Sequence, residues 1–373
     1  MPIPDPEEQL QFLFKVQRLL SEGLFVSTYK YALLLALADL AVERGDDTTE
    51  SLSLDTRDLA EQFIGLYWRQ VLPWVSGGAE GRPTRRLAQA TGSEAVILNR
   101  VAQAHDRYEG SLTRLRHNKR DWNRLLTDVG RTIAIMPLWK LQTVGGQRLD
   151  FMYPNEGRGG RIRMRGEAVY CFRRFRDLVG DLAQTAWVRF VGGLVKNRPI
   201  LGETADLRQF LFGSDRGLLA PFRQFLWDFQ DGRCFYCDNR LRGEVAVDHF
   251  IPWARYALDL GHNLVLADCR CNGDKADRLA AFDHLRRWCA RNERHELIEG
   301  FDKRSLPHEL HRTRRIASWA YSQAESISAG VWQRGRDELA QIDHHWRELS
   351  GMAVAPAVDG GPSSEASRSY SRP

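Results

Sequence analysis

The sequence predicts an α+β protein that is mostly helical, with a small strand–strand–helix module and a zinc knuckle embedded between helical regions. Apolar residues recur at helical spacing over much of the chain. Five of the six cysteines lie between residues 234 and 289, a clustering that favours a metal site over a disulfide scaffold. Two short apolar runs nearby, Glu244–Val247 and Asn263–Ala267, have the length of β-strands.

The first helices are predicted from apolar spacing and from their end signals. Phe12, Val16 and Leu19 share one helical face. A second helix is expected from Thr28 to Arg44, and Asp55 is a suitable N-cap for a third. The N-terminal part of the chain is therefore expected to be a helical bundle.

Changes in pattern divide the chain into five parts. They are an N-terminal helical region (1–75), a mostly helical middle region (84–213), the region with the cysteine cluster (214–300), C-terminal helices (301–350) and a tail (351–373). Ser76–Pro83 is predicted to be a linker and Glu156–Arg165 an exposed loop, because both are rich in glycine. Val331–Leu349 is predicted to be an amphipathic helix, and the composition of the tail predicts disorder.

The charge of the chain is mildly basic, at +5, which is compatible with a polyanionic partner. Arginines cluster within residues 82–86, 158–165, 173–176 and 312–315. Each cluster fits either a solvated helix face or a surface that binds a polyanion. The N-terminus does not have the pattern of a signal peptide, and the most apolar run, Tyr31–Val42, is too short to span a bilayer. We therefore expect a cytoplasmic protein with no membrane contact.

The cysteine cluster predicts a structural zinc site. Cys234 and Cys237 form a C-x-x-C knuckle, whose spacing lets two thiolates bind one tetrahedral Zn²⁺, and Cys271 is the natural third ligand. The fourth ligand is open between two residues. Asp268 precedes Cys271 by three positions and so repeats the spacing of the knuckle, whereas Cys269 is the softer donor but leaves a single residue between itself and Cys271.

A second group of residues predicts hydrolytic chemistry. Asp248 and His249 stand at the end of the first predicted strand, and Asn272 stands where the N-cap of the following helix is expected. Oxygen donors from Asp248 and Asn272 suit Mg²⁺ or a similar divalent cation. A neutral imidazole beside such a cation can take a proton from water.

These pieces together carry a resemblance. The segment from about Asp231 to Arg291, one sixth of the chain, resembles the HNH endonuclease family, or ββα-metal nucleases, in its zinc-stapled form. The patterns C-x-x-C, D-H-x-x-P, N-L and C-N-x-x-K occur in order and with compatible spacing. The resemblance implies an HNH nuclease domain within residues 214–300. Many relatives have cysteine or histidine where this chain has Asp268. This chain therefore differs from the family pattern at the position of the fourth zinc ligand.

The resemblance also implies a role for each candidate catalytic residue. His249 would be the general base, and Asp248 with Asn272 would hold the catalytic cation. Asn263 would brace the loop that carries His249 through backbone hydrogen bonds. Lys275 would lie in the first turn of the helix, close to the phosphate. The implied reaction is hydrolysis of a phosphodiester bond with a single catalytic metal.

The expected partner is nucleic acid, with double-stranded DNA as the first candidate. The helical regions on either side of the module could also form a homo-oligomer or bind a partner protein. Restriction or anti-phage defence is the biological role that analogy with other HNH modules suggests. The alternative is a zinc-stabilised nucleic-acid-binding module without catalysis. That alternative requires the cysteines but has no need of Asp248, His249 and Asn272 together.

Overall fold

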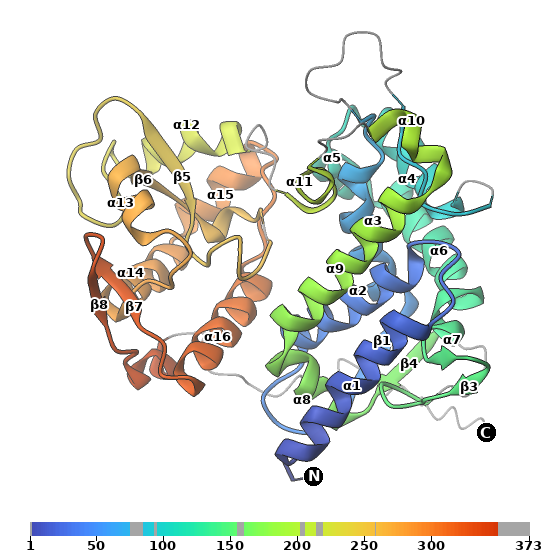
Figure 1. The fold of residues 1–373 in the computed structure, drawn as a ribbon. Helices are drawn as coiled ribbons and strands as arrows, with labels where there is room; N and C mark the ends of the chain where they lie inside the picture. The colour runs from blue at the N-terminus through green and yellow to red at the C-terminus, as the bar shows by residue number, and fades with distance from the viewer. Residues whose placement is uncertain are drawn as a thin grey trace, which may run out of the picture.

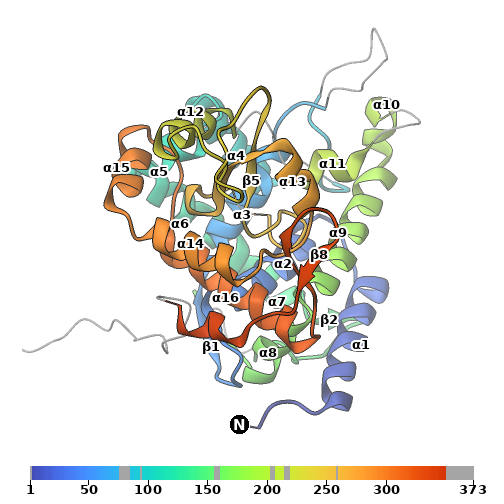
Figure 2. The ribbon, with the colours of Figure 1, turned by 90° about the vertical axis from the view of Figure 1, so that its left-hand side faces the viewer.

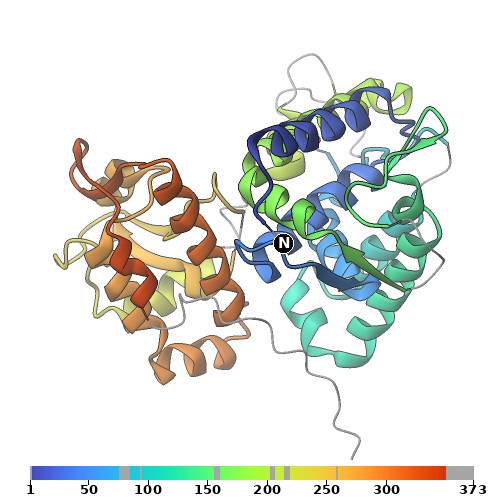
Figure 3. The same cartoon turned by 90° about the horizontal axis from the view of Figure 1, so that it is seen from below.

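The computed structural model describes residues 2–74, 85–92, 95–154, 160–201, 206–213, 219–257 and 259–349. In these parts the protein is a mostly helical α+β structure, as the sequence predicts. The chain forms two lobes that lie side by side (Figure 1, Figure 3). The N-terminal lobe consists of the described residues up to 213, and the C-terminal lobe of the described residues from 219 to 349. Each lobe has its own hydrophobic core. Among the buried core residues described, Val42 of the N-terminal lobe is the one that packs into the core of the other lobe.

The N-terminal lobe is built mainly from helices. They are α1 (Pro6–Glu22), α2 (Tyr29–Arg44), α3 (Thr56–Gln70), α4 (Val96–Arg107), α5 (Leu112–His117), α6 (Lys119–Ile135), α7 (Pro137–Lys140), α8 (Gly166–Arg174), α9 (Arg176–Gly193), α10 (Arg198–Leu201) and α11 (Leu207–Phe212), with a 3-10 turn, η1 (Val195–Asn197). Two small antiparallel pairs join β1 (Leu52–Asp55) to β4 (Arg161–Met164) and β2 (Thr143–Val144) to β3 (Gln147–Arg148).

The first three helices form where the sequence predicts: α2 matches the predicted Thr28–Arg44 within one residue, and α3 begins directly after its predicted N-cap, Asp55. Asp5 caps α1, and Asp55 caps α3; each accepts a hydrogen bond from a backbone N–H of the first turn and forms a capping box. Helix α2 is apolar on nearly all sides and is buried against α3, α8 and α9 (Figure 1). A helix that is apolar all round must lie inside a core, and α2 is the centre of this one.

The prediction of an exposed loop at Glu156–Arg165 is wrong for the second half of this segment. Residues 161–164 form β4, in which Ile162 and Met164 are buried while Arg161 and Arg163 are exposed. This alternation is the pattern of a half-buried strand, and the neighbouring glycines concealed it. The regions predicted on either side of the linker share one hydrophobic core. The linker itself, Ser76–Pro83, and the tail, residues 351–373, lie outside the described residues.

The C-terminal lobe combines two short hairpins with five helices among the described residues. Its elements are α12 (Ala220–Phe229), β5 (Val245–His249), η3 (Gly261–Asn263), β6 (Leu264–Asp268), α13 (Cys269–Lys275), α14 (Phe282–Asn292), α15 (His295–Lys303), α16 (Leu310–Ser326), β7 (Val331–Arg334), β8 (Glu338–Ala340) and η4 (His344–Glu348). Strands β5 and β6 pair antiparallel, within one residue or two of the strands predicted from the sequence.

The amphipathic helix predicted for Val331–Leu349 is wrong. The segment forms the β7–β8 hairpin and the short turn η4. Gly335 adopts a φ of 56° at the hairpin turn, and the backbone of Trp332 exchanges hydrogen bonds with Leu279 and Ala281. Figure 2 views this lobe directly and shows the hairpin beside α13. Tertiary pairing with residues 279–281 therefore overrides the helical spacing of the apolar residues.

The two lobes meet where α2 contacts α16. Two of the four arginine clusters lie at this contact. Arg176 donates to the backbone carbonyl of Arg255 in the C-terminal lobe, and Arg312 and Arg315 donate to Glu43 and Gly45 at the end of α2. These three arginines join the lobes, a role that neither alternative for the clusters includes. Within the described residues, no helix combines the length and the apolar character needed to cross a membrane.

Candidate active site and metal centre

The candidate site is formed at the end of β5. Because β5 pairs with β6, Asp248 lies opposite Val265 and His249 opposite Leu264. Both side chains are largely buried, with 8% of each residue exposed. The strand therefore delivers the two residues into a confined position rather than onto an open surface.

Asp248 is held by two donors at one oxygen. The hydroxyl of Tyr236 donates to Oδ2 of Asp248 at 2.5 Å, and Nζ of Lys275 lies 3.0 Å from the same oxygen. Burial, together with the negative charge of Asp248, raises the pKa of Tyr236 well above its usual value, which keeps the phenol protonated as a donor. The carboxylate is thus fixed in orientation through Oδ2.

His249 has a partner that the sequence did not indicate. Its Nε2 lies 2.7 Å from Oδ1 of Asp259, and its ring packs against Trp253 with the ring centres 5.2 Å apart. A carboxylate at this distance accepts the Nε2–H of a neutral imidazole. Nδ1 is then the ring nitrogen that can accept a proton.

Asn263 makes the backbone contacts that the resemblance implies. The amide N–H of Ile251 donates to Oδ1 of Asn263 at 2.8 Å, and Nδ2 of Asn263 donates to the carbonyl of Ile251 at 3.1 Å. The N–H of Phe250 also donates to the carbonyl of Asn263, at 2.7 Å. These bonds hold the chain immediately after His249 against the start of β6.

The helix that carries Asn272 and Lys275 differs from the prediction. Asp268 is its N-cap, so Asn272 lies in the middle of α13, and Lys275 is its last residue rather than part of a first turn. Lys275 is fully buried, and its Nζ donates to the carbonyl of His249 at 2.9 Å. Ala276, with a φ of 48°, ends the helix, and α14 begins only at Phe282. Lys275 therefore fixes the end of β5 from inside the protein and does not reach out to a phosphate.

The position of Asn272 follows from that of Lys275. The two residues are three positions apart on α13, so their side chains leave the helix on the same side. Since Lys275 reaches Asp248 and His249, Asn272 projects from the face of α13 that is turned toward β5.

Three cysteines come together beside this site. The sulfur atoms of Cys234, Cys237 and Cys271 all lie within 4.8 Å of one another, and all six cysteines of the chain are free thiols. Burial and the neighbouring sulfurs raise the pKa of Cys271. Three thiolates so close together would repel one another, whereas a bound Zn²⁺ neutralises their charge and accepts sulfur ligands, so the donor set fits zinc.

Neither residue considered as the fourth zinc ligand belongs to this group. The carboxylate of Asp268 accepts a hydrogen bond from the N–H of Arg270 at 2.8 Å and so serves as the cap of α13. The backbone N–H of Asp268 donates to Sγ of Cys234 at 3.3 Å. The thiol of Cys269 donates to the carbonyl of Glu244 at 3.2 Å and is exposed. The arrangement provides three protein sulfurs and leaves the fourth position to a side-chain movement or to another donor.

The fold and the site define a module of the ββα-metal type, and comparison with known families agrees. Residues 234–281 match the model of a family described as HNH endonuclease, so this protein contains an HNH endonuclease domain. Residues 9–208, more than half of the chain, match the model of a family described as a domain of unknown function (DUF8808). The protein therefore belongs to the DUF8808 family, with an HNH module following that domain. No curated protein and no solved structure matches the chain.

Proposed function

We propose that this protein is a metal-dependent endonuclease that hydrolyses phosphodiester bonds in DNA. The observation that carries the proposal is the arrangement at the end of β5, where Asp248 is held by Tyr236 and Lys275 and the next residue, His249, has an acidic partner, Asp259. The family match supports a nuclease, and the DNA substrate and the residue roles are our inference.

His249 is the general base in this proposal. Nε2 donates to Asp259, so Nδ1 accepts the proton of the attacking water. As the ring becomes an imidazolium, the carboxylate of Asp259 stabilises its positive charge. The packing of Trp253 against the ring limits its rotation and keeps Nδ1 in one direction.

Asp248 and Asn272 are the residues that would hold the catalytic cation. Their oxygens are hard donors that suit Mg²⁺, and the contacts of Asp248 with Tyr236 and Lys275 use Oδ2, so Oδ1 is the oxygen that a cation would take. When bound, such a cation neutralises the charge that develops on the phosphate and on the leaving oxygen. Cys234, Cys237 and Cys271 would hold a separate, structural Zn²⁺.

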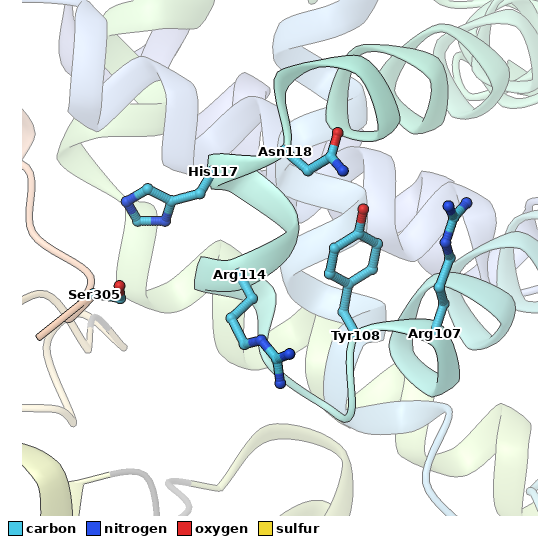
Figure 4. A pocket seen from close by; sticks show the side chains of 6 residues that line it. All are labelled: Arg107, Tyr108, Arg114, His117, Asn118 and Ser305. Atoms are coloured by element: carbon cyan, nitrogen blue, oxygen red, sulfur yellow. The ribbon is translucent and has the colours of Figure 1, made fainter.

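A polar groove between the lobes is a candidate path for the nucleic acid. It encloses about 390 Å³, and Figure 4 shows the residues that line it: Arg107, Tyr108, Arg114, His117 and Asn118 from the N-terminal lobe and Ser305 from the C-terminal lobe. Arginine and histidine side chains in a groove are donors for phosphate oxygens. Phosphate contacts on the N-terminal lobe would orient a substrate that the C-terminal lobe cuts.

One observation favours the non-catalytic alternative, a zinc-stabilised module that binds nucleic acid. The carboxylate of Asp248 already has a buried ammonium, that of Lys275, as its ion-pair partner. A module that binds no catalytic cation would keep such a pair, whereas a nuclease would have to share the carboxylate between Lys275 and the cation. Metal-dependent cleavage separates the two functions.

The test is cleavage of plasmid, linear and single-stranded DNA and of RNA in Mg²⁺ or Mn²⁺, with His249→Ala beside the wild-type protein. We expect His249→Ala to lower the cleavage rate about 10²- to 10⁴-fold, because the reaction loses its general base, while binding of DNA is retained. His295→Ala, which removes an exposed histidine of the same lobe, is the matched control and should cut as the wild type does. Cleavage that persists unchanged in His249→Ala, or that ignores removal of the cation by a chelator, would refute the proposal.

For the biological role we propose restriction or anti-phage defence in the cytoplasm. The support is analogy with other HNH modules and the reducing compartment that free zinc-binding thiols require. The same assay tests this role when DNA from a phage and modified host DNA are compared as substrates. Equal cleavage of both would argue against a defence function that depends on recognising foreign DNA.

A further inference from the structure

The loop that follows His249 is attached to the N-terminal lobe by a buried hydrogen bond. The hydroxyl of Tyr256 donates to Oε1 of Glu43, on α2, at 2.6 Å. Only 3% of Tyr256 and 7% of Glu43 are exposed. The two residues are 213 positions apart, so this contact joins the DUF8808 domain to the HNH module.

Glu43 is held rigidly by two further donors. Arg312 of α16 reaches Oε1 with Nη2 at 2.5 Å, and Gln62 of α3 donates to Oε2 at 2.9 Å. Both oxygens of the carboxylate are therefore engaged, and the acceptor offered to Tyr256 is fixed in place. Burial and the nearby negative charges of Asp39 and Glu43 raise the pKa of Tyr256, which remains a donor.

Arg176 of α9 fixes the same loop from the other side. Its guanidinium lies 4.5 Å from the centre of the Tyr256 ring, and its Nη1 donates to the carbonyl of Arg255 at 2.9 Å. Asp39 of α2 accepts from Nε and Nη2 of Arg176, at 3.0 and 2.8 Å. The N-terminal lobe thus contacts both the side chain of Tyr256 and the backbone of the residue before it.

The attached loop leads directly back to the candidate base. It begins at His249, turns where the carbonyl of Pro252 accepts from the N–H groups of Arg255 and Tyr256, and continues to Asp259. Asp259 lies three residues after Tyr256 and 2.7 Å from Nε2 of His249. Among the described residues between β5 and Asp259, Tyr256 places its side chain in contact with the other lobe, through Glu43 and Arg176.

We propose that Tyr256 is a positioning residue: through its hydrogen bond to Glu43, the N-terminal lobe holds the loop that presents Asp259 to His249. The inference rests on the proposed nuclease function. It makes the DUF8808 domain part of the machinery that aligns the base, and not only a neighbouring domain.

The first test is Tyr256→Phe in the full-length protein, which removes the hydroxyl and keeps the ring beneath Arg176. We expect kcat to fall about tenfold, because a small misplacement of a positioned group has a large effect on rate, with KM within about twofold of the wild type. Tyr153→Phe is the matched control, since Tyr153 is also fully buried and donates to a backbone carbonyl, that of Leu138, at 2.6 Å, inside the N-terminal lobe. The control should lose a similar amount of thermal stability and retain kcat.

A second readout does not depend on cleavage. In the wild-type protein, ¹⁵N NMR of the histidine side chains should show His249 with its proton on Nε2, and both Tyr256→Phe and Asp259→Asn should shift His249 toward a mixture of tautomers. Tyr153→Phe should leave the His249 signals unchanged.

The outcomes separate this inference from the proposed function. A wild-type protein that cuts through His249, with Tyr256→Phe matching Tyr153→Phe in kcat and in the His249 signals, would overturn the inference and leave the nuclease standing. A His249→Ala protein that cuts like the wild type would remove the nuclease assignment and, with it, the inference. A loss of kcat in Tyr256→Phe alone, with a shifted His249 signal, would support both.

Discussion

The two lobes bury different kinds of polar residue. Among the described residues of the N-terminal lobe, the buried polar side chains are uncharged apart from Glu43 and Arg173, and both of these lie at the contact between the lobes. The C-terminal lobe buries a charged or titratable group at each of several positions: Asp248, His249, His262, Lys275, His284 and Arg291. Buried charged and histidine side chains are therefore concentrated in one lobe and at its border.

Burying a charge is unfavourable unless it is paired and hydrogen-bonded, so stability alone does not select for it. The N-terminal lobe shows what stability alone selects, which is an apolar helix, α2, enclosed by other helices. In the C-terminal lobe, Asp248, His249, His262 and Lys275 are buried within residues 234–281, the segment that matches the HNH endonuclease model. This difference is the one expected if a scaffold stands beside the proposed nuclease module, and the predictions below test whether the lobes separate in this way.

The largest expected difference between the lobes comes from removing zinc. Cys271→Ser should strongly destabilise the C-terminal lobe, because a structural zinc supplies roughly 10–16 kcal/mol of folding free energy. Calorimetry should show the C-terminal transition lost or moved to much lower temperature, with the N-terminal transition moved far less. Metal analysis should find one zinc ion fewer per chain.

Cys289→Ser is the matched control for this experiment. Cys289 is a buried cysteine of the same lobe that lies outside the three-sulfur group. Its replacement should leave the zinc content unchanged and weaken only local packing. If the two variants unfold alike and contain equal zinc, the three sulfurs do not form a metal site.

The next largest effect is expected at Lys275. Lys275→Met removes the ammonium that pairs with Asp248 and donates to the carbonyl of His249, and breaking a buried pair in this way typically destabilises by about 3–5 kcal/mol. The unpaired carboxylate should then bind a divalent cation more readily. Thermal unfolding with and without Mg²⁺ tests this, and the stabilisation by Mg²⁺ should be larger in Lys275→Met than in the wild type.

An exposed lysine of the same lobe provides the comparison. Lys303 pairs with Glu299 near the surface, and Lys303→Met should change neither the stability nor the response to Mg²⁺ by a measurable amount. A response to Mg²⁺ that is equal in all three proteins would mean that the cation does not bind at Asp248.

The sequence predicted those parts of the protein whose signals are local. The strand that ends in Asp248 and His249 and the cap Asp55 follow from spacing or residue type within a few positions, and the backbone contacts of Asn263 follow from the HNH resemblance. The HNH resemblance was found for the same reason, since its motifs are short and ordered.

What the sequence did not predict depends on distant or irregular contacts. Asp259 and Tyr256 lie in a loop without periodicity, and the partner of Tyr256 is in the other lobe. The hairpin at β7 and β8 forms because Trp332 pairs with residues 279–281, which no local pattern reveals. Spacing around Asn272 suggested an N-cap, whereas the carboxylate of Asp268 takes that role.

A smaller difference between the lobes is expected in acid. Burial, followed by the positive charges of Arg291, His308 and Arg314, lowers the pKa of His262 from 6.5 to about 3. The unfolded chain therefore binds a proton below pH 6.5 that the folded lobe does not bind, and stability falls by roughly 1.4 kcal/mol per pH unit as the pH decreases from 6.5 toward 3. His262→Phe should remove this contribution.

The measurement is the free energy of unfolding at pH 7.5 and pH 5 for the wild type and for His262→Phe. Acid also protonates zinc-binding thiolates, but this loss is common to both proteins, so their difference isolates His262. The exposed His295 supplies the control, and His295→Gln should follow the wild type. Parallel pH profiles for His262→Phe and the wild type would show that His262 is not held neutral.

The smallest effect is expected in the groove between the lobes, where Arg107 and Arg114 would contact phosphate. Both already pair with acidic residues, Arg107 with Asp121 at 2.9 Å and Arg114 with Glu109 at 2.5 Å, so each contributes less to a polyanion than a free arginine would. The double variant Arg107→Gln/Arg114→Gln should weaken binding of a labelled DNA duplex a few-fold and reduce the slope of log Kd against log salt concentration by at most about 2, since each phosphate contact contributes about 0.9. The double variant Arg18→Gln/Arg208→Gln breaks two similar exposed pairs of the same lobe, with Glu22 and Asp181, and is the control for a general loss of two positive charges. If both variants lower the slope equally, DNA binding depends only on the net charge of the N-terminal lobe. If the slope changes in the groove variant alone, the N-terminal lobe is a binding surface for DNA as well as a scaffold.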